Sequence, residues 1–347
     1  MIVLFGLVTS LAAEATSVFQ GNRLSHEISE LLPHDASWCL VVADQNNGKE
    51  IISTGNATGL LIPASLVKLI TAGAALEREA EGKHATMSTE ILHDGSIDDG
   101  IITGNIVLRG SGNCFLSAAD LRQAAKTLKK TGIMALTGDV VADTARFNTR
   151  GLERTRKGAG YAPVSALGLD LHTVSLAVIP DEPGKPPLVT VEPPNTLVRF
   201  AVSARTVAGG KSTVRVTKHY DNSFQVSGEI PHDSVPLHWR FSVDDPASYA
   251  AQSFKTVLAQ AGIQIMGKPE KGIEPLGVTT LAIIPGQTIT QIVMEMNFNS
   301  LNIAADNLLL VLGTLDDGLP GTREKGLKVI QEHVARHGFS EIGRAHV

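Results

Sequence analysis

The strongest constraint in this sequence is a serine and a lysine three residues apart at the start of a long apolar segment. Ser65 and Lys68 follow Pro63, and no further charged residue occurs before Glu77. Residues at positions i and i+3 share one face of an α-helix, so the Lys68 amine should lie beside the Ser65 hydroxyl. Because this helix is apolar nearly all round, we expect it to be buried.

This placement predicts a reactive serine. Burial and the positive end of the helix dipole both favour the neutral form of a lysine at the head of a helix. A neutral amine can accept the proton of a neighbouring serine hydroxyl and so activate the oxygen as a nucleophile. The spacing alone is common by chance, but the chain contains it once, at a predicted helix start. We therefore predict an acylation site at Ser65.

Two motifs together resemble a known family. Residues 63–68, followed by Thr71 and Ala72, resemble the first motif of the class C low-molecular-mass penicillin-binding proteins, the D-alanyl-D-alanine carboxypeptidase/endopeptidase family. Ser300-Leu301-Asn302 fits the Ser-x-Asn motif of that family, although Ala305-Asp306 stands where the family usually has Ala-Glu. The gap of 235 residues (300 minus 65) looks like the large insertion that sets this family apart. The resemblance extends over 138–144, Phe147, 161–163, 165–167, 245–246 and 262–263.

The resemblance implies acyl transfer on peptidoglycan stem peptides. Ser65 would attack the carbonyl between the terminal D-alanines, and Lys68 would accept its proton. Ser300 would relay a proton towards the leaving amine, while Asn302 would hold Lys68 and the substrate amide in register. The backbone N–H of Ser65 would supply half of an oxyanion hole. β-Lactams would acylate the same serine as substrate mimics, and no cofactor or metal is implied.

Asp143 is the candidate substrate-binding residue. It closes an apparent strand over 139–142. It matches the insertion aspartate that, in this family, is thought to meet the amino group of the stem peptide's diamino acid. A carboxylate that faces an ammonium group can select for it. The alternative is that Asp143 caps a turn before Thr144, which aspartate often does.

A second set of motif matches is predicted to be structural. Residues 111–113 also fit Ser-x-Asn, and Lys130-Thr131-Gly132 fits the family's third motif, Lys-Thr-Gly. Lys130 and Thr131, however, end an amphipathic helix that Gly132 caps. A catalytic Lys-Thr-Gly needs an extended edge strand with which the substrate can pair.

The predicted fold class is α/β of the α+β type. The resemblance implies a serine β-lactamase/penicillin-binding-protein-like catalytic domain, an antiparallel sheet with helices on both faces, with a large β-rich insertion. Residues 37–44 and 50–54 should form a hairpin. We place the insertion, of two subdomains, at 86–276, which splits the catalytic domain into 16–85 and 277–347. Within and after the insertion, strands are expected at 101–109, 174–180, 188–191, 197–202, 212–217, 224–230 and 237–243, and helices at 246–262 and 288–296.

The N-terminus and the charge favour an exported protein. Residues 1–15 have the apolar run and small-residue cleavage site of a signal peptide, although the first basic residue is Arg23. We therefore expect a periplasmic or extracellular protein. A net charge of −5 does not indicate the basic surface that binding of nucleic acid requires. Peripheral contact with a membrane and the oligomeric state stay open.

The cysteines and one histidine pair have simple interpretations. Cys39 lies in a predicted core strand and should be a small buried side chain, with a disulfide to Cys114 as the alternative. His333 and His337 are four residues apart on a predicted helix. Without a third ligand, the sequence favours a solvated helix face over a metal site.

Two other functions stay open. One is another serine acyl hydrolase on the same core, such as an esterase or a β-lactamase, and the other is a non-catalytic peptidoglycan-binding protein. No Lys-Thr-Gly occurs in the 45 residues after Asn302 (347 minus 302), and residues 341–347 resemble a translated sequencing-library adapter. We therefore expect a truncated reading frame and a poorly active chain.

Overall fold

The computed structural model describes residues 23, 26–32, 37–44, 46–56, 61–152, 162–273 and 277–338. The chain divides into two compact units, residues 1–64 with 345–347, and residues 65–344. The predicted signal peptide, residues 1–15, and Tyr161 lie outside the described residues. No helix in the described ranges is long and apolar enough to span a bilayer.

The first unit contains the predicted hairpin. β1 (Cys39–Ala43) pairs antiparallel with β2 (Glu50–Gly55), and Gly48 in the turn has a φ of 70°. Cys39 is exposed, so the prediction that it is buried is wrong. Two strands alone have too little apolar surface to bury both of their faces. Both cysteines are free, and Cys114 is the buried one. Burial raises the pKa of the Cys114 thiol to about 12.

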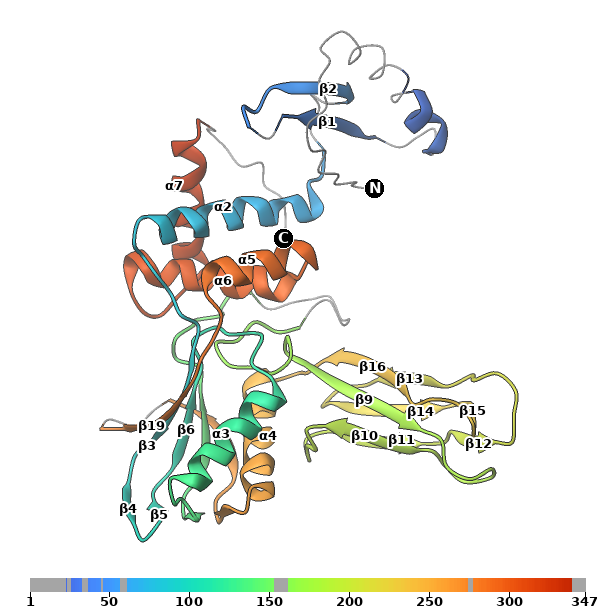
Figure 1. Cartoon of the computed structure of the whole chain (residues 1–347), viewed down its shortest axis with the longest axis vertical. Coiled ribbons are helices and arrows are strands. Elements are labelled where there is room, and N and C mark those ends of the chain that lie inside the picture. The colour runs from blue at the N-terminus through green and yellow to red at the C-terminus, as the bar shows by residue number, and fades with distance from the viewer. Residues whose placement is uncertain are drawn as a thin grey trace. The chain divides into compact units, whose positions relative to one another are not determined.

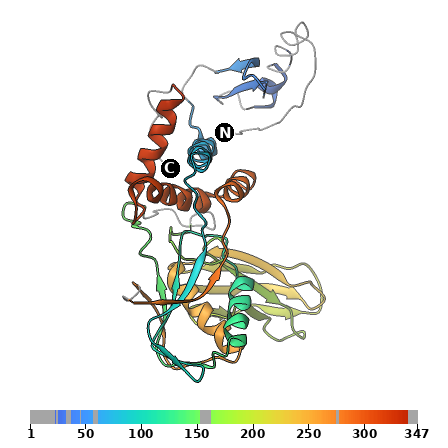
Figure 2. The same ribbon diagram turned by 60° about the vertical axis from the view of Figure 1, so that its left-hand side comes forward.

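The second unit has a helical part formed from two distant segments of the chain. A 3₁₀ turn, η1 (Ala64–Leu66), leads into α2 (Val67–Ala80). α2 packs against α5 (Ile289–Phe298), α6 (Asn302–Asp317) and α7 (Arg323–Arg336), as both ribbon views show (Figure 1, Figure 2). The shared core contains apolar side chains of all of these helices, including Ala72, Ala75, Ile292, Met296, Leu308, Val311, Val329 and Ile330.

The predicted burial of α2 is right for one face only. Lys68, Ala72 and Ala75 are buried, whereas Leu69 and Leu76 are 45% and 40% exposed. The side chains packed on α2 in this core come from α5, α6 and α7, so the face that carries Lys68 is covered while Leu69 and Leu76 point outwards.

A mixed five-stranded sheet lies in the β-rich middle of the chain, in the order β18-β8-β6-β3-β19. Its strands are β18 (Pro269–Gly272), β8 (Val140–Asp143), β6 (Ile106–Arg109), β3 (Thr89–His93) and β19 (Thr279–Ile284). The neighbours β18, β8 and β6 run parallel, and β3 is antiparallel to β6 and β19. A smaller sheet joins β17 (Gln264–Ile265), β7 (Ala135–Leu136), β5 (Ile101–Thr103) and β4 (Ser96–Asp98).

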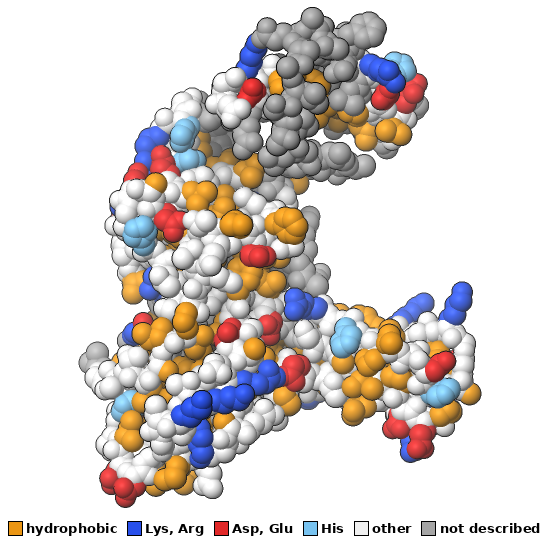
Figure 3. Space-filling view, in the orientation of Figure 1, with side chains coloured by type: hydrophobic (Ala, Val, Ile, Leu, Met, Phe, Trp, Pro, Cys, Tyr) orange, Lys and Arg blue, Asp and Glu red, His pale blue; other side chains and the backbone are white. Residues whose placement is uncertain are grey.

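Two helices, α3 (Ala118–Lys130) and α4 (Pro246–Gln260), pack on the five-stranded sheet. Val140 and Ala142 of β8 join the same core as these helices, and Val141 joins a small cluster of its own, as the alternation of a strand requires. α4 confirms the helix expected at 246–262; Asp245 caps it with its side chain and Pro246 is its first residue. A band of Lys and Arg side chains lies over α3 on the face seen in Figure 3.

Short strands build the arm on the right of Figure 1. One sheet contains β10 (Leu188–Glu192), β9 (Thr173–Ile179) and β16 (Leu237–Ser242), and a second contains β11 (Arg199–Val202), β14 (Ser223–Ser227) and β13 (Arg215–Lys218). β12 (Arg205–Val207) pairs with β15 (Glu229–Pro231). The predicted strands are present, with ends that differ by up to three residues, as at β13, and 101–109 and 224–230 are each divided in two. Gly104 and Gly228, at φ of 147° and 93°, interrupt them.

The second set of motif matches is structural, as predicted. Lys130 is the last residue of α3, Thr131 is its C-cap, and Gly132 follows with a φ of 93°. Asn113 accepts the N–H of Phe115 in a local turn at 2.9 Å.

A buried arginine joins three helices of the helical part. The guanidinium of Arg78 on α2 donates to Asp316 of α6 at 3.0 Å, to Glu332 of α7 at 2.6 Å and to Glu81 at 3.0 Å. Burial opposes the charge, but the carboxylates outweigh it and raise the pKa of Arg78 above its ordinary value. A buried charge that keeps all of its partners favours this one arrangement of the helices.

Replacement of this arginine should therefore loosen the helical part. We expect Arg78→Met to lower the free energy of unfolding by about 2 kcal/mol, because the three carboxylates lose a shared buried cation while Lys83 and Arg336 stay beside Asp316 and Glu81. Urea denaturation followed by circular dichroism at 222 nm measures this loss. The exposed Arg215→Met is the matched control and should change stability by less than about 0.5 kcal/mol. Equal stabilities for the two variants would contradict the role given to Arg78.

Candidate active site

The predicted nucleophile lies in a sharp turn. Ser65 is the middle residue of η1, directly before α2, and its side chain is exposed. Ala64, the residue before it, has a φ of 47°, in the left-handed region that non-glycine residues rarely adopt. Such conformations often occur at functional sites, where the surrounding structure holds them in place. The turn leaves the Ser65 hydroxyl accessible at the head of the helix.

Lys68 lies one turn further on and is only 8% exposed. Its Nζ is 3.2 Å from Ser65 Oγ, so the contact predicted from the i, i+3 spacing is confirmed. This pair is built entirely within one segment of the chain.

The third member comes from the turn between α5 and α6. Ser300 Oγ donates to Ser65 Oγ at 3.1 Å and lies 3.5 Å from Lys68 Nζ. Ser300 has a φ of 52°, and the N–H of the next residue, Leu301, donates to Met296 O at 2.9 Å to close the turn. The structure therefore brings together three polar groups that come from opposite ends of the unit.

Asn302 is the first residue of α6 and is half-buried. It follows Ser300 by two positions, so the turn that carries Ser300 also fixes the start of the helix that carries Asn302. The structure thus places the Ser-x-Asn segment beside the Ser65 and Lys68 pair.

A residue that the sequence reasoning did not single out anchors α6. The amide of Asn307 is buried, and its Nδ2 donates to Gly112 O at 3.0 Å and to Ser165 O at 3.1 Å. These bonds fix the helix that begins at Asn302 to the loops at Gly112 and Ser165. The available signal was an amide side chain next to Asp306 in the otherwise apolar run 303–313, because buried polar side chains almost always have a partner.

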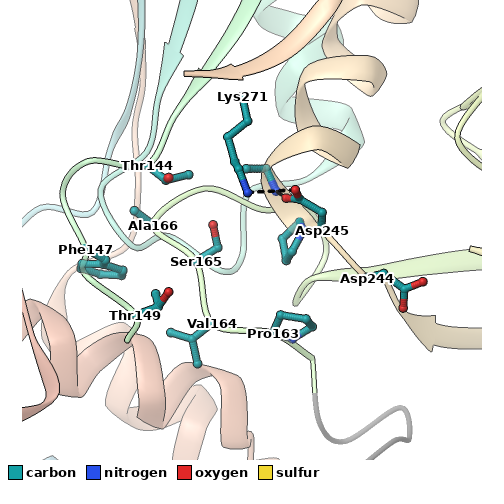
Figure 4. A pocket seen from close by; sticks show the side chains of 12 residues that line it. Thr144, Phe147, Thr149, Pro163, Val164, Ser165, Ala166, Asp244, Asp245 and Lys271 are labelled. Atoms are coloured by element: carbon teal, nitrogen blue, oxygen red, sulfur yellow. Dashed lines mark hydrogen bonds and ion pairs between the residues drawn. The ribbon is translucent and has the colours of Figure 1, made fainter. Parts of the chain in front are cut away.

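Asp143 lies at the end of β8 and is buried. Its Oδ1 accepts the N–H of Ala145 at 2.7 Å, the geometry of a turn cap. The next residue, Thr144, lines a cavity of about 170 Å³ together with Phe147, Ser165 and others. On the wall of this cavity, Lys271 Nζ lies 3.0 Å from Asp245 Oδ2 (Figure 4).

The three contacts define the chemistry that is available at this site. A serine hydroxyl, a buried lysine amine and a second serine hydroxyl form a closed triangle with edges of 3.2, 3.1 and 3.5 Å. Such a triangle can take a proton from the nucleophile and deliver it to a leaving group without a metal or a cofactor. This arrangement of groups is the one that serine acyl transfer requires.

Comparison with known proteins identifies the family. The model of the D-Ala-D-Ala carboxypeptidase 3 (S13) family matches residues 24–343, and the chain belongs to this family. It is 27% identical over 320 residues to a D-alanyl-D-alanine carboxypeptidase of Actinomadura sp. (strain R39), an alignment that covers 88% of this chain and 59% of that protein. It is 24% identical over 313 residues to D-alanyl-D-alanine carboxypeptidase DacB of Haemophilus influenzae, covering 86% of this chain and 64% of that protein. The chain thus spans about three fifths of the length of these relatives.

Solved structures share the mixed α/β fold. The crystal structure of penicillin binding protein 4 (dacB) from Haemophilus influenzae superposes with a TM-score of 0.71 at 23% identity, over 92% of this chain and 72% of that chain. A second structure of the same protein, described as complexed with a novel β-lactam, gives a TM-score of 0.67 at 22% identity, over 90% and 69% of the two chains. These matches confirm the fold class predicted from the sequence.

Proposed function

We propose that this chain carries the acyl-transfer site of a serine D-alanyl-D-alanine carboxypeptidase/endopeptidase that acts on peptidoglycan stem peptides. The observation that carries the proposal is the triangle of Ser65, Lys68 and Ser300, formed by segments 235 residues apart in a chain of the S13 family. The family is one of D-Ala-D-Ala carboxypeptidases, which favours this function over the alternatives of an esterase or a β-lactamase.

Acylation is the first step. Ser65 Oγ forms a bond to the carbonyl carbon between the two terminal D-alanines, and its proton passes to Lys68 Nζ, 3.2 Å away. The carbonyl oxygen takes up the negative charge, which the backbone N–H of Ser65 stabilises. When the tetrahedral intermediate collapses, the C–N bond breaks and the leaving D-alanine amine receives the proton through the Ser300 hydroxyl.

Hydrolysis of the ester completes the cycle. Water attacks the carbonyl carbon of the acyl-enzyme and gives a proton to Lys68. The bond to Ser65 Oγ then breaks and the serine recovers its proton, which regenerates the starting state. Asn302, at the start of α6, is proposed to hold Lys68 and the substrate amide in register during both steps.

β-Lactams are proposed as covalent inhibitors of the same site. The Haemophilus influenzae relative is described in a complex with a β-lactam. In such a reaction the amide bond of the lactam ring takes the place of the D-alanyl-D-alanine bond, and the opened ring stays attached to Ser65 as an ester.

Because the proposed substrate is cell-wall peptide, we also propose a periplasmic or extracellular location, with residues 1–15 as the signal peptide that directs export.

The domain organisation is likewise proposed from the fold. We assign the helical part and the hairpin to a split catalytic domain and the β-rich middle to an inserted region of two subdomains. The pairing of β19 with β3 supports a return boundary after Ile284 rather than at 276, since both strands belong to the same sheet.

Mapping of a penicillin adduct tests the nucleophile directly. We expect the chain, incubated with a penicillin, to gain one adduct on the tryptic peptide of residues 50–68, which contains Ser53 and Ser65. Fragmentation in the mass spectrometer should assign it to Ser65, and Ser65→Ala should abolish it. The position of the adduct, and not the rate at which it forms, tests the assignment.

The matched control uses the serine of the other Ser-x-Asn match. Ser111→Ala removes a hydroxyl that bonds to the backbone of Ser88, and this variant should be labelled like the wild type. An adduct on another residue, or an adduct that survives in Ser65→Ala, would refute the assignment of the nucleophile. Complete absence of an adduct in the wild type would favour a peptidoglycan-binding protein without catalysis.

The role of Asp143 needs a test of its own. The hydrogen bond that Asp143 accepts from Ala145 supports the role of a turn cap. The selector role is supported by the next residue, Thr144, which lines the cavity. Asp143→Asn separates the two, since asparagine can keep the bond to Ala145 but has no charge. If Asp143 is a selector, kcat/KM should fall at least about tenfold more on stem peptides with a free side-chain amine than on acetylated ones. Equal losses of kcat/KM on both substrates would show that Asp143 acts only as a turn cap.

A further inference from the structure

Three potential metal ligands meet where α2 packs against α7. Glu77 belongs to α2, His333 belongs to α7, and His337 is the C-cap residue directly after α7. One ligand atom from each lies within 4.8 Å of the others. The side chain of His333 is only 16% exposed and bonds to Glu77, so the sequence prediction of a solvated helix face is wrong for this residue. The third ligand comes from a helix 256 residues away along the chain, where sequence spacing gives no signal.

The separations suit a tetrahedral metal. Zn²⁺ binds histidine nitrogen and carboxylate oxygen at about 2.1 Å, which places two ligand atoms of a tetrahedral site about 3.4 Å apart. His333 Nδ1 lies 2.6 Å from Glu77 Oε2, and His337 Nε2 lies 3.8 Å from Glu77 Oε1. These distances, each to a different oxygen of the Glu77 carboxylate, lie on either side of that value, so binding of an ion requires the side chains to rotate. His333 and His337 keep the four-residue spacing that recurs in zinc sites on helices.

The surface of α2 is shaped to receive the His333 ring. A Cβ atom at Gly73 would lie 2.7 Å from His333 Nε2, so a side chain at this position would push the ring away. The ring therefore presents Nδ1 to Glu77. The side chain of His337 is 58% exposed, which leaves solvent access for a water molecule as the fourth ligand.

One cation competes with a metal for Glu77. Arg336 Nη2 lies 3.2 Å from Glu77 Oε2, while its Nη1 donates to Glu81 Oε1 at 2.6 Å. Glu81 therefore retains the guanidinium when Glu77 turns towards a metal. The exchange leaves no charged group without a partner, which would otherwise oppose binding.

We propose that Glu77, His333 and His337 bind Zn²⁺ or a neighbouring divalent transition metal that ties the nucleophile helix to α7. Glu77 follows Ser65 by 12 positions (77 minus 65), or about 18 Å along a helix. The ion is therefore structural and does not contact the acyl-transfer site. This inference stands independently of the proposed function.

Metal titration of the whole chain tests the proposal. The protein, stripped with a chelator, is titrated with Zn²⁺ by calorimetry and with Co²⁺ by visible absorption, which reports tetrahedral coordination. We expect one ion per wild-type chain. His337→Ala loses a direct ligand and should bind Zn²⁺ at least about 100-fold more weakly. The exposed His84→Ala is the matched control and should bind like the wild type.

Thermal unfolding gives a second readout. A ligand that binds only the folded chain raises Tm, so Zn²⁺ should raise the Tm of the wild type and of His84→Ala but not that of His337→Ala. Glu77→Gln keeps the side-chain shape and should also lose the response. Equal Zn²⁺ affinity in the wild type, His337→Ala and Glu77→Gln, or no binding by the wild type, would overturn the proposal.

Discussion

The packing of α2 against the α5–α6 pair is the interaction on which the candidate site depends. Ser65 and Lys68 are neighbours on one helix, but Ser300 reaches them only because the α5–α6 turn lies against the head of α2. Apolar side chains such as Ala72, Met296 and Leu308 provide the driving force, since their burial removes nonpolar surface from water. Arg78 makes this packing specific, because its guanidinium must meet carboxylates on both α6 and α7.

The long segment between Ser65 and Ser300 is compatible with a site made from distant parts of the chain. β3 and β19 are adjacent in one sheet, so the chain enters and leaves the β-rich middle at neighbouring strands. Loop closure over such a distance costs little more than closure over a shorter one, because the entropy grows only with the logarithm of length. Asn307 then fixes α6 to the loops at Gly112 and Ser165. The β-rich middle of the chain thus supports the Ser-x-Asn helix.

Local patterns predicted much of this structure, and contacts between distant segments explain what they missed. The Ser65 and Lys68 contact follows from helix periodicity, and the α4 start follows from Asp245 and Pro246. Ser300 could be placed only through a family resemblance, because no spacing rule spans 235 residues. Cys39 was expected in a core that its two-stranded hairpin does not provide. His333 was assigned to solvent because its partner Glu77 lies 256 residues away, beyond any spacing rule for the helix of His333. Strand β3 was missed because its residues 89–93 mix polar and apolar types without a clean alternation.

A double-mutant cycle on acylation tests most directly whether the three side chains act as one site. The rate of acylation by a penicillin is measured for the wild type, Lys68→Ala, Ser300→Ala and the double variant, with Lys130→Ala as a control at the other motif match. If the triangle functions as a unit, each single change slows acylation about 100-fold or more, and the double variant is at most about tenfold slower than the slower single variant. Independent losses that multiply to about 10⁴-fold, or a wild-type rate in Lys68→Ala, would contradict this account.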